Sequence, residues 1–210
     1  MKAFQVWGMA LVLLISIGAS MSAWWSLDLR WRPKTIREHE SRIAAVLERS
    51  GWVSPGLTGP KLYMVAPANC AACTRFSSAH FADLQAKGVD TRIIAVASLP
   101  GGRAPDAKEA DTIAELWVNR SWDLYRAWVR EGQAWEAEGV PPSEGDAARQ
   151  AVLAASQRTV TDLARDLRAN GVEFDYPVLV WWTRDGKMKA CACTRPQTDR
   201  RVLRDFGLKS

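Results

Sequence analysis

The sequence has no internal repeat and no long low-complexity tract, so neither a repeat array nor a low-complexity chain is indicated. It also has no Lys/Arg cluster that recurs with aromatic residues, although the net charge is +5. That absence argues against a nucleic-acid-binding module, and we predict a solvated basic surface with no nucleic-acid partner. The 210 residues, 48% hydrophobic and 24% charged, suit one globular domain with an additional segment at one end.

Histidine and cysteine are both scarce. Of the two histidines, His39 has no evident partner, and His80 lies on one face of a predicted helix, as core or boundary residues do. None of the four cysteines is solitary: they form two pairs, Cys70/Cys73 and Cys191/Cys193. Unpaired thiols are a liability in an oxidising compartment, so strictly paired cysteines favour an exported domain.

Charge is absent from Ala3 to Leu27, and Val6–Ile17 is almost wholly apolar. About 20 apolar residues cross a bilayer, so we predict that residues 1–27 form a transmembrane anchor. Trp24 and Trp25 would then lie at the far membrane interface. The alternative is a cleaved signal peptide, with the small residues of "GASMSA" as the cleavage region.

The charges around this segment give conflicting signals about its orientation. Five basic residues follow it closely: Arg30, Arg32, Lys34, Arg37 and Arg42. The positive-inside tendency would place the domain in the cytoplasm. The paired cysteines and the short N-terminal tail favour the other side. We predict a protein of the bacterial inner membrane whose domain faces the periplasm, and the cytoplasm-facing orientation stays open.

Residues 28–60 are predicted to be a tether that contains one amphipathic helix. The segment "TIREHESRIAAVLERSG" places apolar side chains on one side of such a helix, and Gly51 with "SPGLTGP" ends it. This apolar stripe can pack on the domain or on a second copy of the chain. The domain itself is predicted to span residues 61–210.

The predicted elements of the domain follow the order β-α-β, a helical block, and β-β-α. Strands are predicted at 61–66, 91–97, around 177–182 and near Met188, and the first is followed by a helix that ends near Gly88. Asp106, with Glu109 three residues later, has the spacing of a capping box, and the apolar pattern extends that helix to Trp128. Further helices are predicted at about 146–169 and 198–206. The first two strands are predicted to be parallel, and Asp185–Gly186 makes the last two an antiparallel hairpin.

The motif "NCAAC" places Cys70 and Cys73 where the first strand gives way to a helix. Such a pair can close a static disulfide, hold half of a metal site or exchange electrons. The free N–H groups of a first helical turn favour a thiolate, which would lower the pKa of Cys70 below the free value of about 8.5. Cys73, one turn further in, would then resolve the mixed disulfide. This placement favours a redox role over a static disulfide.

The ordered set "NCAAC", "GVDTRIIAVA", "IAELWVNRSWDLYRAWVREG" and "FDYPVLVWWTRDGKMK" with a final helix resembles the thioredoxin fold. Within that fold it is most similar to the periplasmic disulfide-bond proteins of the DsbC/DsbG type. These proteins also carry a helical insertion between the second and third strands, at about residues 105–170 here. The resemblance covers about residues 60–208 and implies an α/β, thioredoxin-like domain behind the N-terminal membrane anchor.

The resemblance also implies a function. It implies a membrane-tethered periplasmic thiol–disulfide oxidoreductase, or an isomerase, with Cys70 and Cys73 as catalytic residues and no cofactor. Its partners would be cysteine-containing exported proteins and a redox partner protein. Tyr176 and Pro177 would position the substrate across a cis peptide bond, although thioredoxins usually have Thr or Val before that proline. The N-terminal dimerisation domain of DsbC is missing, which favours oxidoreductase over isomerase activity.

Cys191 and Cys193 lie in the loop after the last short strand. We predict that they form a second redox pair or a structural disulfide. One alternative is a single metal site that uses all four cysteines, as in a metal-binding or metallochaperone protein on the same fold. Another is a non-catalytic component of an envelope complex.

Overall fold

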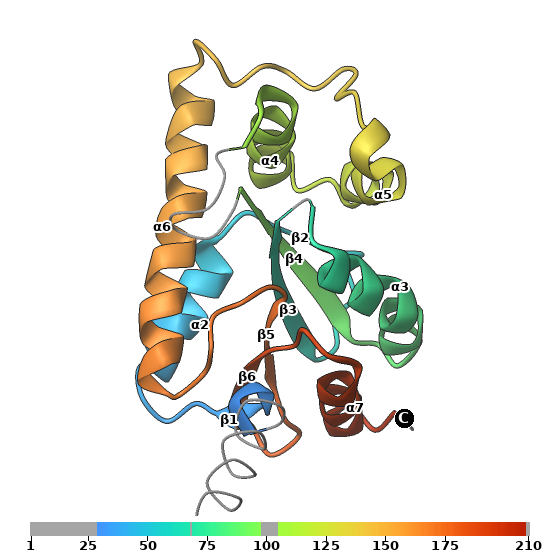
Figure 1. Cartoon of the computed structure of the whole chain (residues 1–210), viewed down its shortest axis with the longest axis vertical. Coiled ribbons are helices and arrows are strands. Elements are labelled where there is room, and N and C mark those ends of the chain that lie inside the picture. The colour runs from blue at the N-terminus through green and yellow to red at the C-terminus, as the bar shows by residue number, and fades with distance from the viewer. Residues whose placement is uncertain (1–28, 68, 98–104, 209–210) are drawn as a thin grey trace, which may run out of the picture.

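The computed structural model describes residues 29–67, 69–97 and 105–208 and places a six-stranded sheet at the centre of the protein (Figure 1). The strand order is β1-β6-β5-β3-β4-β2. The strands are β1 (Lys34–Thr35), β2 (Trp52–Val53), β3 (Lys61–Pro67), β4 (Asp90–Val96), β5 (Val178–Trp182) and β6 (Met188–Ala192). The helices are η1 (Leu29–Trp31), α2 (Glu40–Arg49), α3 (Ala71–Ala86), α4 (Ala107–Asn119), α5 (Trp122–Glu131), η2 (Gly132–Ala134), α6 (Ala147–Ala169) and α7 (Pro196–Asp205).

The strand β3 lies in the middle of the sheet, where both of its faces are covered. It runs parallel to β4 and antiparallel to β5, and its residues 62–66 are all buried. A continuous apolar run is what such a doubly covered strand requires. The hairpin between β5 and β6 turns at Gly186, whose φ of 77° lies in the left-handed region that glycine adopts without strain.

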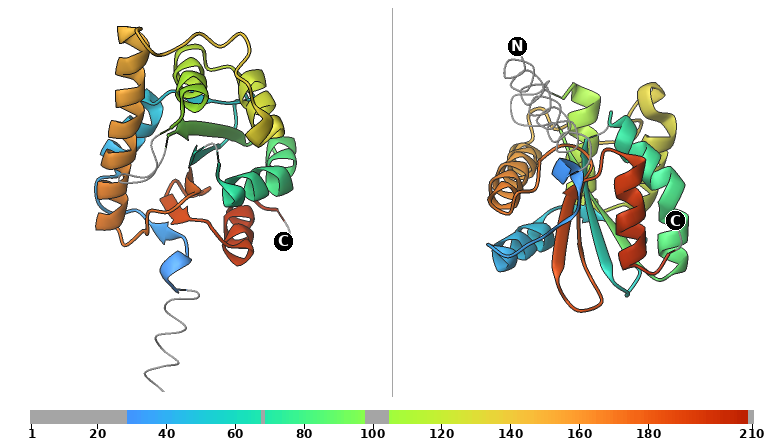
Figure 2. Two further views of the ribbon diagram at one scale, coloured as in Figure 1. Left: turned by 45° about the horizontal axis from the view of Figure 1, so that its top comes forward. Right: turned by 60° about the horizontal axis from the view of Figure 1, so that its bottom comes forward.

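Helices cover both faces of the sheet. Figures 1 and 2 show α3 and α7 on one face and α2 and α6 on the other, with α4 and α5 beyond the end of β4. Trp181 of β5 is fully buried, and its indole N–H donates a hydrogen bond to Asp205 of α7 at 3.0 Å. The side chains of β5 that share the face of Trp181 therefore point toward α7.

Residues 29–60, which the sequence predicts to be a tether, are part of the packed structure. The strand β1 pairs with β6, and β2 pairs with β4, so both edges of the sheet come from this segment. The amphipathic helix α2 packs on α6, and the Asn170 carboxamide accepts hydrogen bonds from the backbone N–H groups of Arg37 (2.8 Å) and Glu38 (2.9 Å). The apolar stripe of the helix is thus buried within its own chain.

The helix that the sequence predicts from Asp106 to Trp128 is two helices. Asp106 does cap α4, because its carboxylate accepts the N–H of Glu109 at 2.9 Å. The chain then turns at Arg120, whose φ is 51°, and Ser121 caps α5 by accepting the N–H of Leu124 at 3.1 Å. A serine offers the backbone an alternative to continued helix, which explains the break.

The predicted anchor, residues 1–27, lies outside the described residues. Within the ranges that the structure describes, no helix is both long enough and apolar enough to cross a membrane.

An ion pair between α2 and α6 gives a first prediction. The Asp166 side chain, 1% exposed, accepts two hydrogen bonds of 2.5 Å from Arg42 and one of 3.0 Å from Arg165. The hydrogen bond from Arg42 holds the pKa of Asp166 below its usual value. We expect Arg42→Ala to lower the free energy of unfolding at pH 7, because it leaves a buried carboxylate with fewer donors.

The effect should depend on pH in one direction. A lowered carboxyl pKa stabilises the fold above the pKa of the unfolded chain, and this stabilisation is lost as pH falls through the folded-state pKa. Urea denaturation should therefore show a smaller difference between Arg42→Ala and wild type in acid than at pH 7. Arg158→Ala, on an exposed position of α6, is the matched control. An equal loss in that control would contradict the prediction.

Candidate active site

Cys70 and Cys73 are joined by a disulfide at the start of α3. The strand β3 ends at Pro67, and Cys70 is the N-cap of the helix, with its sulfur accepting the N–H of Cys73 at 3.1 Å. Cys70 is partly exposed, whereas Cys73 is only 4% exposed. The first-turn N–H groups stabilise negative charge at the Cys70 sulfur. An external thiol therefore reaches Cys70 first.

The helix α3 is anchored by the side chains that follow the two cysteines. Phe76 and Leu84 are fully buried, and the rings of Phe76 and Phe81 meet edge to face at 6.1 Å. These contacts fix the helix on the sheet, and with it the position of its N-terminal end. The site is thus attached to a rigid element.

Tyr176 and Pro177 lie at the same end of the sheet as the two cysteines. Their peptide bond is cis, and the next residue, Val178, pairs with Val65 near the end of β3. The backbone N–H of Tyr176 donates to the Asp175 carboxylate at 2.8 Å. A substrate strand that uses this N–H would first have to displace that carboxylate.

The Tyr176 side chain is buried, with 8% of its surface exposed. Its hydroxyl has no hydrogen-bond partner among the described residues. Burial, with a smaller contribution from the negative charge of Asp175, raises the pKa of this phenol. The hydroxyl therefore stays neutral at physiological pH.

Cys191 and Cys193 form a second disulfide at the end of β6. Cys191 belongs to the strand itself and only Cys193 follows it, so the prediction that both lie in the loop after the strand is wrong for Cys191. Cys191 lies opposite Leu179, which shares a sheet face with Trp181, so this disulfide lies on the α7 side of the sheet. Both residues are almost fully buried, at 1% and 0% exposed, and the N–H of Cys193 donates to the Pro177 carbonyl at 2.9 Å. The second pair thus contacts the backbone of the predicted substrate-positioning segment.

The different burial of the two disulfides predicts the order in which they are reduced. With limiting dithiothreitol, we expect Cys70–Cys73 to open at least about tenfold faster than Cys191–Cys193, because an external thiolate needs access to a sulfur. Alkylation at timed intervals followed by peptide mass spectrometry measures both rates. In denaturant the difference should largely disappear. Earlier opening of Cys191–Cys193 in the native protein would contradict the prediction.

A charged cluster joins α3 to α7 close to the cysteines, and the sequence did not indicate it. Asp199 of α7 is buried and forms an ion pair with Arg75, two residues after Cys73. His80 Nε2 lies 3.5 Å from the same Asp199 carboxylate, and its ring packs against Phe76 at 5.2 Å. His80 is therefore a boundary residue beside a charged pair. The helix α7 contains several charged residues, and nothing in the sequence distinguishes the buried Asp199 from the exposed ones.

The space beside Cys70 is an open hollow of about 310 Å³. Its lining includes Asn69, Thr74, Trp128 and Gln133, so the helix α5 forms the wall opposite α3. The helical insertion therefore contributes directly to the surroundings of the exposed cysteine.

The two cysteine pairs do not assemble into one metal site. Each pair is closed into its own disulfide, and the described residues contain no group of three or more His, Cys, Asp or Glu that could hold a metal ion. The four-cysteine metal site is therefore not formed in this arrangement.

Comparison with known proteins shows which solved structures have a similar fold. No protein-family model and no curated protein matches the chain. Among solved structures, BcfH of Salmonella enterica Typhimurium superposes with a TM-score of 0.52 at 15% identity, covering 98% of this chain and 93% of that one. DsbA of Chlamydia trachomatis covers 76% and 91% at 12% identity, with a TM-score of 0.34. The likeness to BcfH and the strand order confirm the predicted thioredoxin-like fold.

Proposed function

We propose that the chain is a thiol–disulfide oxidoreductase whose reactive pair is Cys70 and Cys73. The observation that carries the proposal is the asymmetry of this disulfide. Cys70 is a partly exposed helix N-cap next to an open hollow, and Cys73 is buried behind it. One sulfur is placed to be attacked and the other to leave and return, which a purely structural disulfide does not need.

The reaction follows from this geometry. A substrate thiolate attacks Cys70 Sγ, the Cys70–Cys73 bond breaks, and Cys73 leaves as a thiolate that takes up a proton from solvent. The second substrate thiolate then attacks the substrate sulfur of the mixed disulfide and expels Cys70 as a thiolate. The substrate loses two electrons and two protons, and the protein gains a dithiol. The reverse sequence reduces a substrate disulfide.

The remaining parts of the proposal concern place and partners. We propose a DsbC/DsbG-type protein, with residues 1–27 as its membrane anchor and its domain in the periplasm. Cysteine-containing exported proteins would be its substrates, and a redox partner protein would restore its oxidation state. The apolar, uncharged N-terminal stretch and the strictly paired cysteines support this placement.

We also propose Cys191–Cys193 as a second redox pair. Because both cysteines are buried, this pair would exchange electrons with Cys70–Cys73 and not directly with external thiols. Its hydrogen bond to the Pro177 carbonyl supports a coupling to the first pair. A Cys191→Ser/Cys193→Ser variant should then change the redox potential of Cys70–Cys73. An unchanged potential would leave the second pair a structural disulfide.

The activity is tested with the full chain in detergent. Dithiothreitol-driven reduction of insulin and oxidation of a reduced dithiol peptide by the disulfide form cover both directions of electron flow. We expect wild type to catalyse at least one of them and Cys70→Ser to lose at least about 100-fold of that rate, since the exposed sulfur is gone and the remaining Cys73 is buried. Absence of both activities in wild type would contradict the proposal.

Orientation is tested separately in cells. Alkaline phosphatase fused after Ser210 should be active and a cytoplasmic reporter at the same position silent. The opposite pattern would place the domain in the cytoplasm.

A further inference from the structure

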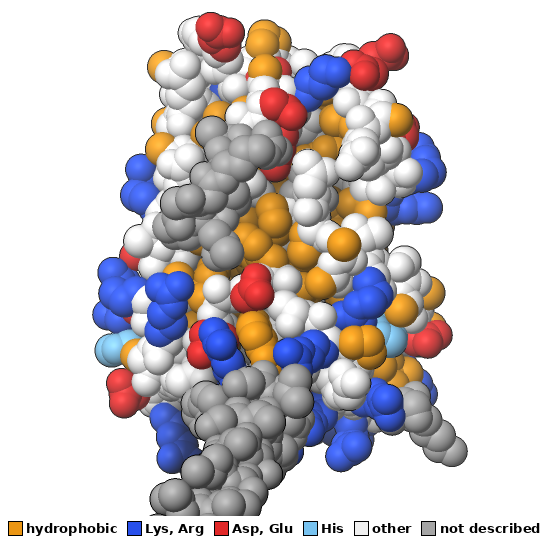
Figure 3. Space-filling view, in the orientation of Figure 1, with side chains coloured by type: hydrophobic (Ala, Val, Ile, Leu, Met, Phe, Trp, Pro, Cys, Tyr) orange, Lys and Arg blue, Asp and Glu red, His pale blue; other side chains and the backbone are white. Residues whose placement is uncertain are grey.

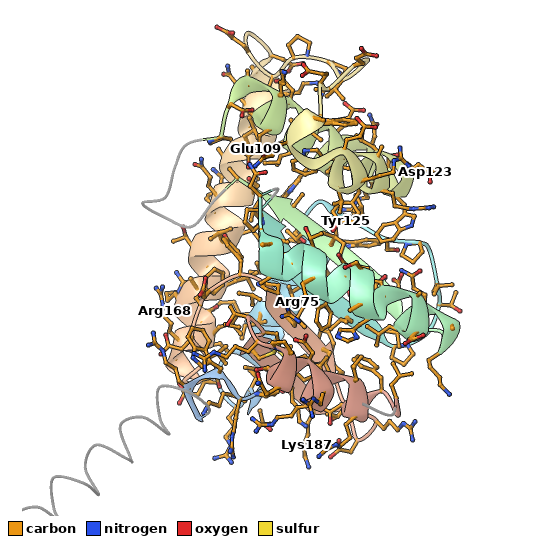
Figure 4. The ribbon with its side chains drawn as sticks, turned by 45° about the vertical axis from the view of Figure 1, so that its right-hand side comes forward. Arg75, Glu109, Asp123, Tyr125, Arg168 and Lys187 are labelled. Atoms are coloured by element: carbon orange, nitrogen blue, oxygen red, sulfur yellow. A yellow bond between two sulfur atoms is a disulfide. The ribbon has the colours of Figure 1, made fainter. Side chains whose placement is uncertain are left out.

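A row of neighbouring hollows begins at Cys70 and extends along the helix α3. The hollow beside Cys70 shares Thr74 and Val129 with a second hollow of about 510 Å³, and it shares Trp128 and Gln133 with a third of about 580 Å³. Hollows that share lining residues lie next to one another, and we call this row of three the groove. The first two hollows lie between α3 and α5, and the third lies between the start of α4 and the end of α5. Figure 4 shows Tyr125 in the space between α3 and α5.

The second hollow defines how far the groove reaches from the redox cysteine. Its α3 lining runs from Thr74 to Gln85, which is 4 to 15 positions after Cys70. At about 1.5 Å per helical residue, these positions lie about 6 to 22 Å along the helix from Cys70. An extended peptide covers that distance with about two to seven residues.

The second hollow has an apolar floor. Phe81 and Tyr125 are 7% and 8% exposed, and Val129 lines both this hollow and the one beside Cys70. Trp122 stacks on Tyr125 at 5.4 Å. On the molecular face seen in Figure 3, hydrophobic side chains gather below α4 and α5, and Lys/Arg side chains border α5 on the right.

The charge along the groove is uneven. Arg126 and Arg130 of α5 line the second hollow, and no acidic residue is among its described lining residues. Arg126 forms no ion pair within the described part of the chain, and Arg130 pairs only with its exposed neighbour Glu131 at 3.6 Å. At the other end, beyond Cys70, Asp106 and Glu109 line the third hollow with Lys108, which pairs with Glu136. The basic section thus lies on only one side of the redox site.

We propose that this groove binds an extended segment of the substrate polypeptide and selects acidic residues about three to five positions from the reacting cysteine. The inference rests on the proposed function and adds its substrate class. The position of the hollows argues for this occupant, because the hollow beside Cys70 shares Thr74 and Val129 with the second one, where residues near the reacting cysteine of a substrate can lie. The two cations make acidic side chains the complementary ones, and electrostatic complementarity acts mainly on the rate of association.

The test uses peptides with one cysteine joined by a disulfide to 2-nitro-5-thiobenzoate. Cys70 attacks the peptide sulfur and releases thionitrobenzoate, and Cys73 then attacks Cys70 and releases the peptide thiol. The protein dithiol becomes a disulfide, and the mixed disulfide becomes two thiols. Three Glu or three Lys residues occupy positions 3–5 from the cysteine, on its N-terminal side in one pair of peptides and on its C-terminal side in the other.

With pre-reduced full-length protein in detergent at low salt, we expect the Glu peptide to react about tenfold faster than the Lys peptide in at least one chain direction. The Glu-to-Lys rate ratio measured with the protein is divided by the same ratio measured with glutathione as the attacking thiol. This division removes intrinsic differences in peptide reactivity. It should fall with salt, because exposed charges are screened. Arg126→Gln/Arg130→Gln should abolish the preference, and Arg126→Glu/Arg130→Glu should reverse it.

Arg158→Glu/Arg168→Glu is the matched control, since it makes the same change of net charge on α6. Figure 4 places Arg168 on α6, away from the groove. The preference should survive in this control. Equal rates for Glu and Lys peptides in both directions, or the same loss in the control, would overturn the groove inference. Wild type that reacts with none of the peptides and not with the free aromatic disulfide would instead overturn the proposed function.

Discussion

Cys70 is expected to react with iodoacetamide at least about tenfold faster than Cys73 when the fully reduced native protein is alkylated at pH 7. Only a thiolate reacts, and Cys70 is the residue at the helix N-terminus, where N–H groups stabilise negative charge. It is also the more exposed of the two, since Cys73 is 4% exposed. Peptide mass spectrometry after timed quenching gives both rates from one sample.

The pH dependence separates electrostatic activation from simple access. If the helix terminus favours the thiolate, the labelling of Cys70 should stay fast below the pH at which an ordinary cysteine slows by about tenfold per unit. In denaturant both cysteines should label at similar rates. Faster labelling of Cys73 in the native protein would contradict the assignment of Cys70 as the attacking residue.

The parts of the fold that the sequence could predict are those with a regular pattern or a local signal. The apolar run of β3, the turn at Gly186 and the Asp106 cap all depend on residues close together in the chain. The strands β1 and β2 have two residues each, which is too short for any periodicity to appear. Their place in the sheet is decided by partners far away in sequence.

The candidate site divides in the same way. The motif at Cys70 and Cys73 is visible in the sequence because its spacing and its place at a strand–helix junction carry the chemistry. The ion pair of Arg75 with Asp199 joins residues 124 positions apart, so only the packing of α7 on α3 brings them together. The sequence also did not predict the α5 wall of the groove, for a different reason. The break at Arg120 sets the direction of α5, and the sequence pattern predicted an unbroken helix there.

The Cys73→Ala variant is expected to accumulate mixed disulfides with its substrates. When Cys70 attacks a substrate disulfide, Cys73 normally displaces the bound substrate from Cys70. Alanine has no sulfur, so the covalent adduct persists until another thiol reaches it. After acid quenching and alkylation, non-reducing gels should show high-mass species that disappear with dithiothreitol, at least about tenfold above the wild-type level. The change is small in volume at a buried position, so the fold should be retained.

Cys70→Ala is the control that makes this result specific, because it keeps Cys73 and removes the exposed sulfur. Adducts of equal intensity in that variant would show that another cysteine captures the partners and that the site is misassigned. The trapped peptides also report on specificity, since each carries the sequence around the captured cysteine. If the α3–α5 groove guides the substrate, acidic residues should be enriched three to five positions from that cysteine, and Arg126→Gln/Arg130→Gln in the trapping background should remove the enrichment. Capture without any such bias would support Cys70 as the attacking residue and count against the groove, so one experiment separates the chemistry from the selection of the substrate.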